Sequence, residues 1–550
     1  MAFDIDCPVL VIGAGPVGLT FALDLAWRGI DVTVVEKRLA GAAPEPKCNH
    51  VSARSMEVFR RLGMAREIRD AGLPADFEHS VSYRTTFVGA ELTRIHIPSR
   101  RNRYTDHSGP DGHWPTPEPP HRINQIYLEP ILFRHAAENP RIRILSGYEA
   151  TDIHISDLGA QVTLQSISGG NTLRAACRYL VGCDGARSAV RKAIGAEFVG
   201  DAVIQRVQST FIRAQGLRAL QKSKPAWGNG IINLRRSGMV YAIDGTELWL
   251  VHNYLRPDEL DFEAVDRDWA IRTILGVGDG FTYEQISKED WYGRRLVANR
   301  FRKRSAFIAG DACHVWVPYA GFGMNAGIAD AVGLSWLLAA VLQGWADERL
   351  LNAYEAERMP ITEQVSRFAM AHAEKEIKRR GAVPQRLEEE SDFGIALRKD
   401  VGALTYEINV QQYAAAGLNF GTYYDASPII SYDTREFPGY TMSTYTPSTI
   451  PGCRLPHVFL PDGRSLYDEL GPHYTLLRIA PEADIDHLVT AARAARVPLS
   501  ICELPSGLGD IAAPRLILVR PDQTVAWRGD EISREGAAAL VALVTGNHAT

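Results

Sequence analysis

The sequence has few cysteines, no long apolar run and no excess of positive charge. Its seven cysteines are scattered and never form a CxxC pair, so we expect neither a disulfide framework nor a zinc or other metal site. No stretch approaches eighteen uninterrupted apolar residues, and the segment from Met1 to Asp6 is acidic where a secretory signal would be basic. With 60 basic and 65 acidic residues, the net charge of −5 favours neither nucleic acid nor a membrane as a partner. These absences favour a cytoplasmic globular protein, and at 550 residues we expect several domains.

The most informative stretch is a dinucleotide-binding pattern at the start of the chain. Four apolar residues, Val9 to Ile12, precede Gly13, Gly15 and Gly18, and a run with helical spacing of apolar residues follows. These glycines suit a tight turn, the approach of a pyrophosphate to the backbone and the close packing of helix on strand. Glu36 ends the next strand, where an acid suits the ribose hydroxyls of an adenosine and repels a 2′-phosphate. The pattern predicts a βαβ unit that binds FAD or NAD.

Two later strand ends carry related signals. Asp184 and Gly185 end an apolar strand, although a plain strand-to-helix turn explains them as well as a site does. Asp311 follows a second buried strand and precedes the glycine-rich start of a helix, residues 321–325. Backbone N–H groups at such a start can meet an anion or an electron-rich ring edge, and Asp311 can accept a hydrogen bond from a sugar hydroxyl.

Several other polar residues remain open between a binding and a structural role. Arg54 either neutralises a phosphate or holds a mobile flavin, or is a solvated helix charge, and Gln125 either donates to a ligand carbonyl or caps a helix. His252, Tyr241 and Tyr254 are candidates for the base that draws a proton from a substrate hydroxyl, although packing within a sheet explains each of them equally well.

Two charged segments and one strand-rich segment complete the pattern. Residues 200–290 alternate as strands of a sheet with one packed and one available face, which predicts an inserted substrate domain. Residues 100–120 are expected to form an exposed excursion or lid. Residues 375–390 are expected to form a solvated helix or linker, because they are dense in charge.

Taken in order, the three motifs resemble the group A flavoprotein monooxygenases, the para-hydroxybenzoate hydroxylase-like superfamily. The resemblance covers about residues 5–375. It implies that Asp311 holds the ribityl chain of FAD and that Pro318 and the loop from Gly321 to Asn325 lie against the isoalloxazine. The positions that it assigns to cofactor binding are Gly13, Gly15, Pro16, Gly18, Glu36, Lys37, Arg54, Gln125, Asp184, Arg187, Gly310, Asp311, Pro318, Gly321, Gly323, Met324 and Asn325.

The last part of the chain resembles the thioredoxin-like domain of the phenol hydroxylase branch, which includes aromatic-polyketide and hydroxyphenylpropionate hydroxylases. Residues 457–460 and the hairpin from Leu516 to Arg528 carry this resemblance, and both are expected to form strands. No CxxC is present, so we expect a scaffold or homodimer contact and no redox role.

The expected fold is α/β and α+β: a Rossmann-like FAD-binding domain with an inserted β-sheet substrate domain, and a C-terminal thioredoxin-like domain. The expected FAD-binding segments are residues 1–80, 121–200 and 290–375, and the expected substrate segments are residues 81–120 and 201–289. A helical or linker region over residues 376–440 and the C-terminal domain over residues 441–550 follow.

The resemblance implies an aromatic hydroxylase. In that family NAD(P)H reduces FAD, O₂ adds to give a flavin C4a-hydroperoxide, and one oxygen is transferred to a small electron-rich aromatic substrate. A second GxGxxG domain is missing, as expected if the nicotinamide docks transiently. One departure is Pro46-Lys47-Cys48, where many relatives carry Pro-Arg-Ala. The alternatives are a flavin-dependent reductase or dehydrogenase without oxygen transfer, and a flavin-binding assembly protein.

Overall fold

A parallel sheet forms the part of the molecule that carries the N-terminus. The computed structural model describes residues 3–505 and 514–547. The sheet has the order β17-β18-β8-β1-β2-β5, and the neighbours from β18 to β5 are all parallel. Its strands are β1 (Ile5–Ile12), β2 (Val32–Glu36), β5 (Ile142–Ser146), β8 (Thr172–Gly182), β17 (Arg302–Lys303) and β18 (Ala306–Ile308), with β6 (Tyr148–Ile155) and β7 (Ala160–Ser166) extending it beside β8. Strands far apart in the sequence therefore end at one edge, which is where ligands bind in such sheets.

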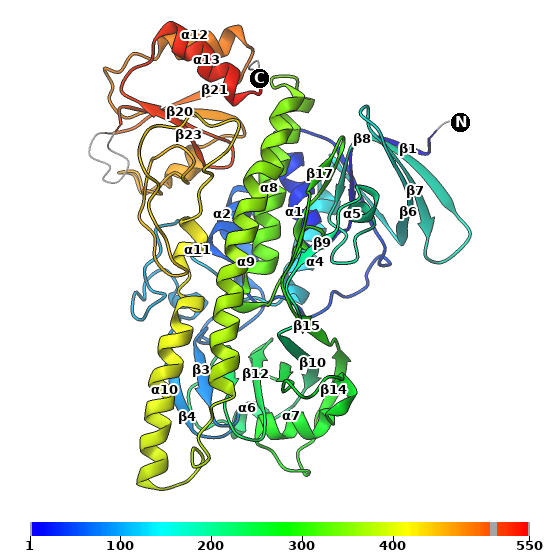
Figure 1. Ribbon diagram of the computed structural model, residues 1–550, viewed down its shortest axis with the longest axis vertical. Helices are drawn as coiled ribbons and strands as arrows, with labels where there is room; N and C mark the ends of the chain where they lie inside the picture. The colour runs from blue at the N-terminus through cyan, green and yellow to red at the C-terminus, as the bar shows by residue number, and fades with distance from the viewer. Residues whose placement is uncertain (1–2, 506–513, 548–550) are drawn as a thin grey trace.

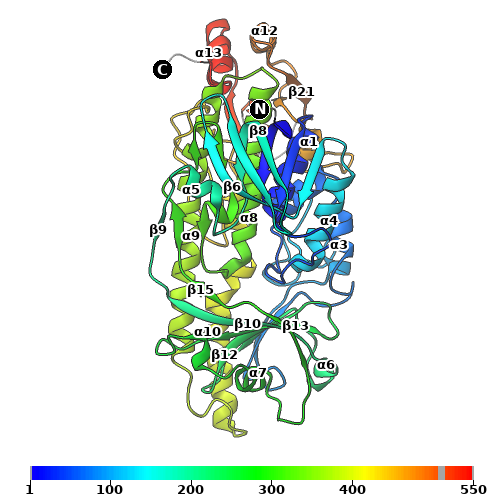
Figure 2. The same ribbon diagram turned by 90° about the vertical axis from the view of Figure 1, so that its right-hand side faces the viewer.

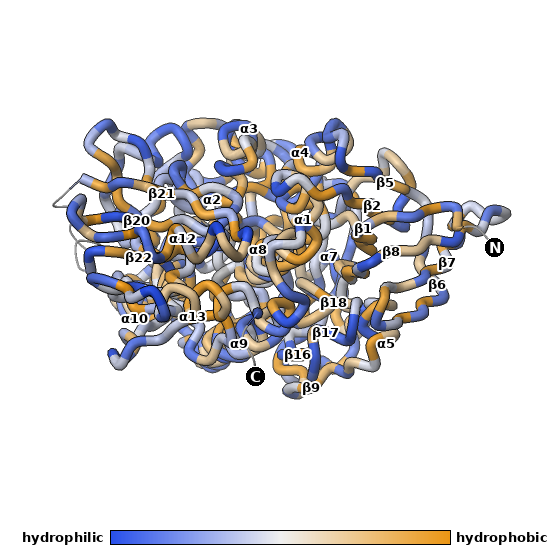
Figure 3. The backbone as a smooth tube through the Cα atoms, turned by 90° about the horizontal axis from the view of Figure 1, so that it is seen from above, coloured by the Kyte–Doolittle hydropathy of each residue, from blue (hydrophilic) through white to orange (hydrophobic). Residues whose placement is uncertain are grey.

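Helices α1 (Pro16–Trp27) and α8 (Phe322–Leu342) pack against each other beside this sheet. Both are apolar almost all round, as is typical of buried helices. In the described part of the chain, α8 alone is long and apolar enough to cross a membrane, but 89% of its most apolar window is buried in the protein. Figure 3 shows orange, apolar backbone around α1 and α8 near the middle of the molecule. The helix α8 is therefore a core helix.

A second sheet lies at the opposite end of the molecule from the C-terminal unit (Figures 1 and 2). Its order is β14-β10-β13-β12-β11-β3-β4, with β15 beside β10, and only the β11–β3 pair is parallel. The strands are β3 (Val81–Arg84), β4 (Glu91–Ile95), β10 (Gln205–Arg213), β11 (Gly228–Ile231), β12 (Ser237–Ala242), β13 (Leu248–Tyr254), β14 (Glu284–Lys288) and β15 (Trp291–Gly293). The sheet expected over residues 200–290 is thus present, and β3 and β4 from an earlier segment complete it.

Two long helices run along the molecule beside these sheets (Figure 1). They are α9 (Asn352–Arg380) and α10 (Asp392–Tyr413), and α10 packs against both α9 and β4. The expectation of a solvated segment over residues 375–390 is wrong for its first part. Glu376 and Arg379 are 4% and 9% exposed and form an ion pair of 2.7 Å. Their charges compensate each other, which lets the end of α9 be buried.

The segment over residues 100–120 is only partly the exposed excursion that the sequence predicts. Its first half is largely exposed, but Arg103 and Asp111 are almost fully buried and form an ion pair of 2.8 Å. Glu118 is also buried, paired with Arg69 at 2.8 Å. These pairs anchor the second half of the segment to the protein.

The C-terminal unit has a four-stranded sheet of order β21-β20-β22-β23, in which only β20 and β21 are parallel. Its strands are β20 (Tyr474–Arg478), β21 (Leu499–Glu503), β22 (Leu516–Val519) and β23 (Val525–Gly529), and its helices are α12 (Asp486–Ala494) and α13 (Arg534–Val544). This arrangement is thioredoxin-like, and the hairpin of β22 and β23 is confirmed. The strand predicted over residues 457–460 is wrong, because the chain turns back between Leu460 and Arg464, whose backbone groups bond at 2.8 Å.

The remaining elements are short. The other helices are α2 (Ala53–Arg61), α3 (Ala65–Asp70), α4 (Gln125–Glu138), α5 (Ala189–Ala193), α6 (Leu217–Leu220), α7 (Arg267–Leu275) and α11 (Ala416–Phe420). The strands β9 (Phe198–Gly200), β16 (Leu296–Ala298) and β19 (His314–Val315) form a small third sheet. In the sequence, β9 and β16 lie where the chain passes from one large sheet to the other.

Candidate functional site

One cavity of about 910 Å³ connects the first turn of the parallel sheet with the second sheet. It is lined by residues of all three motifs that the sequence singles out. The predicted site residues in its lining are Gly13, Gly15, Pro16, Glu36, Lys37, Gln125, Asp184, Arg187, Asp311, Pro318, Gly321, Gly323, Met324, Tyr241 and His252. The other predicted positions, Gly18, Arg54, Tyr254, Gly310 and Asn325, lie behind this lining or elsewhere in the described chain.

The turn between β1 and α1 is shaped by its glycines. A Cβ at Gly18 would lie 2.0 Å from the carbonyl oxygen of Gly13, so Gly18 permits the close approach of helix and turn. Gly15 differs, because a Cβ there would meet no atom within 4 Å. No side chain caps the N-terminus of α1, and Pro16 occupies its first turn. The turn therefore offers open space and uncapped backbone N–H groups at the positive end of the helix, which suits a phosphate.

Glu36 is held rigidly at the end of β2. Its carboxylate accepts hydrogen bonds from the backbone N–H of Ala14 at 2.7 Å and of Arg38 at 2.9 Å, and from the Arg38 guanidinium at 3.1 Å. Arg38 also pairs with Glu129 of α4, which accepts a hydrogen bond from the Gln125 amide at 2.8 Å. Gln125 thus faces the cavity but is not the cap of α4, since Asn124 takes that place.

The two later aspartates behave differently. Asp184 accepts hydrogen bonds from the backbone N–H groups of Ala189 at 2.6 Å and Val190 at 3.3 Å, so it serves the strand-to-helix turn while lining the cavity. Asp311 is accessible from the cavity and hydrogen-bonds to no described residue. Desolvation by the surrounding protein raises the pKa of the Asp311 carboxyl. An unbonded carboxyl group in this position fits a hydroxyl donor from a ligand.

The start of α8 is fixed to the start of α2 by Asn325. Its amide oxygen accepts from the Ser52 N–H at 2.8 Å and the Ser55 hydroxyl at 2.7 Å, and its NH₂ donates to the carbonyls of His50 at 3.0 Å and Gly321 at 2.6 Å. All four hydrogen-bonding positions of the amide are used in this way. Asn325 therefore shapes the glycine-rich loop from behind the cavity wall.

A buried charge cluster that sequence reasoning missed lies under the same loop. Asp330 of α8 accepts from Arg358 at 2.8 Å and from the Gly310 N–H at 3.1 Å, and pairs with His314 at 2.8 Å. Burial acts to raise the pKa of Asp330, but Arg358 and His314 outweigh it and hold that pKa below its usual value. The signal in the sequence is an aspartate in the middle of an otherwise apolar helix. The cluster fixes the turn that carries Asp311.

Arg54 lies away from the cavity. Burial and the neighbouring Arg454 lower the pKa of its guanidinium, and Tyr424, Glu57 and Asp522 are the groups that oppose this shift. It therefore lies where α2 meets the C-terminal unit, and it is not part of the lining of this cavity.

The end of the cavity at the second sheet is lined by aromatic rings. The ring centroids of Trp227 and Tyr241 lie 5.0 Å apart, and those of Tyr241 and His252 lie 5.5 Å apart. Behind them, Trp291 borders a smaller adjoining cavity, and its ring centroid lies 5.9 Å from that of His252. Burial lowers the pKa of His252 to about 4, so its imidazole is neutral at pH 7. Burial raises the pKa of the Tyr241 phenol well above its usual value, so it stays protonated.

Tyr254 is displaced from this wall. It borders a small adjoining cavity of about 50 Å³, and the Arg380 guanidinium lies 4.2 Å from its ring centroid. Burial raises the pKa of Tyr254 well above its usual value. Of the three proposed bases, His252 alone is unprotonated at neutral pH and lines the main cavity.

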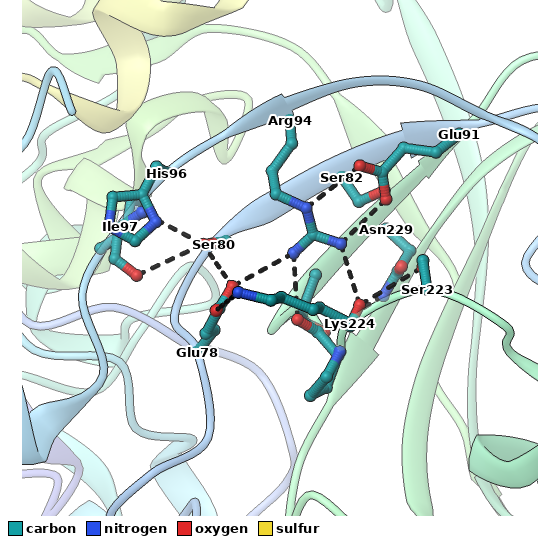
Figure 4. A network of polar contacts seen from close by, with 12 residues as sticks. Glu78, Ser80, Ser82, Glu91, Arg94, His96, Ile97, Ser223, Lys224 and Asn229 are labelled. Carbon is teal, nitrogen blue, oxygen red and sulfur yellow. Dashed lines mark hydrogen bonds and ion pairs between the residues drawn. The ribbon is translucent and has the colours of Figure 1, made fainter. Parts of the chain in front are cut away.

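A polar network holds the loop that precedes Trp227, as Figure 4 shows. Arg94 of β4 donates to the carbonyl oxygens of Lys224 at 2.9 Å and Pro225 at 3.0 Å, and it pairs with Glu91 at 2.8 Å. The network therefore fixes the loop that leads to Trp227, one of the aromatic residues that line the cavity. Within the described residues, no group of three or more His, Cys, Asp or Glu side chains is placed to hold a metal ion.

Comparison with known proteins identifies the family. Residues 6–369 match the family model for the FAD binding domain, and residues 448–547 match that for the aromatic-ring hydroxylase C-terminal domain. The chain belongs to the FAD-dependent aromatic-ring hydroxylases. It is 30% identical to the FAD-dependent monooxygenase apdD of Emericella nidulans, over 98% of this chain and 90% of that protein.

Solved structures share the whole architecture. RebC with bound 7-carboxy-K252c is 31% identical and covers 99% of this chain and 100% of that one, with a TM-score of 0.89. Aklavinone-11 hydroxylase in complex with FAD and aklavinone is 27% identical, covers 99% of this chain and 100% of that one, and has a TM-score of 0.81. FAD is therefore the cofactor of this monooxygenase family, and the open glycine turn, the rigid Glu36 and the unbonded Asp311 fit it.

Proposed function

We propose that this enzyme uses NAD(P)H and O₂ to hydroxylate a phenolic or related aromatic ring. The observation that carries the proposal is the single cavity that joins the dinucleotide turn at Gly13 and Gly15 to the aromatic wall of Trp227, Tyr241 and His252. Such a cavity can hold a two-part cofactor at one end and a planar ring at the other.

The residues divide by their place along the cavity. Glu36 would accept hydrogen bonds from the ribose of the adenosine, and the turn at Gly15 would receive the pyrophosphate. Asp311 would hold the ribityl chain, and Pro318 with the loop at Gly321 would lie along the ring system. Bound FAD supplies the redox and oxygen chemistry that amino acid side chains lack, while the protein orients the ring and excludes water.

His252 would act on the substrate hydroxyl. A neutral imidazole whose pKa lies near 4 is a weak base, so it would accept a hydrogen bond from the substrate O–H and orient the ring. Tyr241, which stays protonated, would donate a hydrogen bond or pack against the ring. This division follows from the burial that sets each pKa.

The main alternative is a reductase or dehydrogenase on the same scaffold, which would oxidise NAD(P)H or substrate without transferring oxygen. The aromatic wall at the cofactor cavity supports the hydroxylase over a reductase that oxidises NAD(P)H alone, because such a reductase needs no site for an aromatic ring. A flavin-binding assembly protein is the second alternative, and it would bind FAD without turnover.

Stopped-flow kinetics tests the proposal. The FAD-loaded protein is mixed with NADH or NADPH across a panel of phenols and then with O₂. Faster reduction in the presence of a phenol, followed by a transient absorbance typical of a flavin C4a-hydroperoxide, is the expected result. Reduction without that transient for every ring tested would favour the reductase.

A further inference from the structure

Arg122 faces the substrate end of the cavity and forms no ion pair with any residue that the structure describes. It precedes α4, lines the cavity and is 4% exposed. Its guanidinium lies 4.6 Å from the ring centroid of Trp227 and 5.8 Å from that of Tyr413. It makes no hydrogen bond with any residue in the described ranges. A buried guanidinium with free donors beside two aromatic rings is an unusual and costly arrangement.

The surrounding charges do not balance it. Among carboxylates, that of Asp111 has the largest electrostatic effect on Arg122, and no ion pair joins these two residues. One Asp111 oxygen pairs with Arg103 at 2.8 Å, and the other accepts from the Trp114 indole at 2.9 Å. Arg103 and Asp111 compensate each other, so the charge of Arg122 is left without a carboxylate of its own among the described residues.

We propose that Arg122 binds an ionised oxygen of the aromatic substrate, with Trp227 and Tyr413 holding the guanidinium in place and the ring of the substrate beside them. The ligand would be a planar aromatic compound that carries an anionic oxygen, either in a phenolate or in a carboxylate. The inference rests on the proposed function and names the substrate class and a binding residue for that same site.

The arrangement fits this ligand physically. An arginine presents a planar set of N–H donors that matches a carboxylate or phenolate, and charge-assisted hydrogen bonds are strong where water is excluded. An ionised oxygen also raises the electron density of the ring on which it sits, which favours attack on an electrophilic oxygen. A purely packing role for Arg122 does not explain why its donors face the cavity unbonded.

The histidine, cysteine and tyrosine side chains that face Arg122 do not titrate near neutral pH. Burial lowers the pKa of His50 and His79 well below the usual value, raises that of Cys48 to about 11, and raises that of Tyr241 well above its usual value. Burial likewise raises the pKa of Tyr413 and of Asp111, although the buried ion pair with Arg103 favours the carboxylate form of Asp111. A change in ligand binding between about pH 6 and about pH 9 therefore reports the ionisation of the ligand.

Three matched probes test the proposal on the FAD-loaded protein: anthraquinone, 2-hydroxyanthraquinone and anthraquinone-2-carboxylate. Dissociation constants come from quenching of tryptophan fluorescence, and the visible band of the hydroxy probe distinguishes its phenol from its phenolate. We expect the protein to bind the ionised probes more tightly than anthraquinone, and to lower the ionisation midpoint of the hydroxy probe by about one pH unit or more.

Two variants and one control locate the effect. Arg122→Gln should weaken binding of the ionised probes by about tenfold to hundredfold and return the midpoint to that of the free probe, with anthraquinone binding little changed. Arg122→Lys keeps the charge without the planar fork and should give intermediate values. Arg213→Gln removes an exposed arginine at the end of β10, paired with Glu247 and Glu284, and should change nothing.

The outcomes separate the possible ligands and the possible failures. Tighter binding of the carboxylate at all pH values points to a carboxylate substrate, and tighter binding of the phenolate points to a phenolic one. Equal binding of neutral and ionised probes by the unmodified protein overturns the proposal, as does an Arg122→Gln protein that retains full FAD and the original constants. Because no probe experiment uses NAD(P)H or O₂, a failure of hydroxylation leaves this result standing.

Discussion

Replacing Gly15 by alanine should weaken FAD binding while leaving the protein folded. Gly15 has φ −74° and ψ −179°, an extended conformation that alanine adopts without strain, and a Cβ there would meet no protein atom within 4 Å. The folded apoprotein should lose only about 1 kcal/mol, because alanine is a poorer N-cap than glycine. The added methyl group, however, would occupy the space that a pyrophosphate needs to reach the backbone. We expect FAD to bind about tenfold to hundredfold more weakly, the equivalent of one charge-assisted hydrogen bond.

The assay pairs two measurements on three variants. Flavin fluorescence during titration of the apoprotein gives the dissociation constant of FAD, and urea unfolding of the apoprotein gives its stability. Gly18→Ala should fail to fold, since its Cβ would lie 2.0 Å from a carbonyl oxygen. Gly278→Ala is the matched control, because that glycine is equally open but lies outside the cavity lining. A Gly15→Ala protein that binds FAD as tightly as the unmodified one would refute the reasoning.

Three further predictions follow from single contacts. Asp311→Ala should leave the fold intact but lose bound FAD, seen as a colourless purified protein, and a fully yellow variant would refute the role of Asp311. Arg520→Met should cost about 3–5 kcal/mol in urea unfolding, because Arg520 is buried and pairs with Glu357 at 2.6 Å and Asp522 at 2.7 Å, and an unchanged midpoint would contradict this. Burial lowers the pKa of His252 from 6.5 to about 4, so between these pH values the unfolded chain binds more protons and the free energy of unfolding falls as the pH falls. His252→Phe should reduce this fall, and an equal dependence of the free energy of unfolding on pH in both proteins would contradict the prediction.

The parallel sheet and its ligand edge are predictable because they depend on local patterns. The apolar strand before Gly13, the helix after it and Glu36 follow one another within a short stretch, so the residues that shape this turn are close in sequence. Asp311 is found in the same way, as an acid directly after a buried strand. The structure brings these separate strand ends to one cavity, as the parallel order of the sheet requires.

The sequence predicts the surroundings of charged residues poorly where their partners lie on other elements. The end of α9 is rich in charge and would be solvated alone, but Glu376 is buried against Arg379 and accepts a hydrogen bond from Asn409 of α10 at 2.6 Å. Arg54 is on a predicted helix, and its proximity to Arg454 and Asp522 of the C-terminal part of the chain is a feature that no local pattern reveals. Arg122 gives no signal at all in the sequence, because its aromatic neighbours Trp227 and Tyr413 come from distant parts of the chain.

The central claim is that the flavin in this cavity transfers an oxygen atom to an aromatic ring. The most direct measurement is mass spectrometry of the product after turnover with NAD(P)H under ¹⁸O₂, using a phenol that accelerates flavin reduction. The account predicts one ¹⁸O atom in each molecule of hydroxylated product, with consumption of NAD(P)H matching its formation. Oxidation of NAD(P)H with no ¹⁸O in any aromatic product would contradict the account and identify the protein as a reductase.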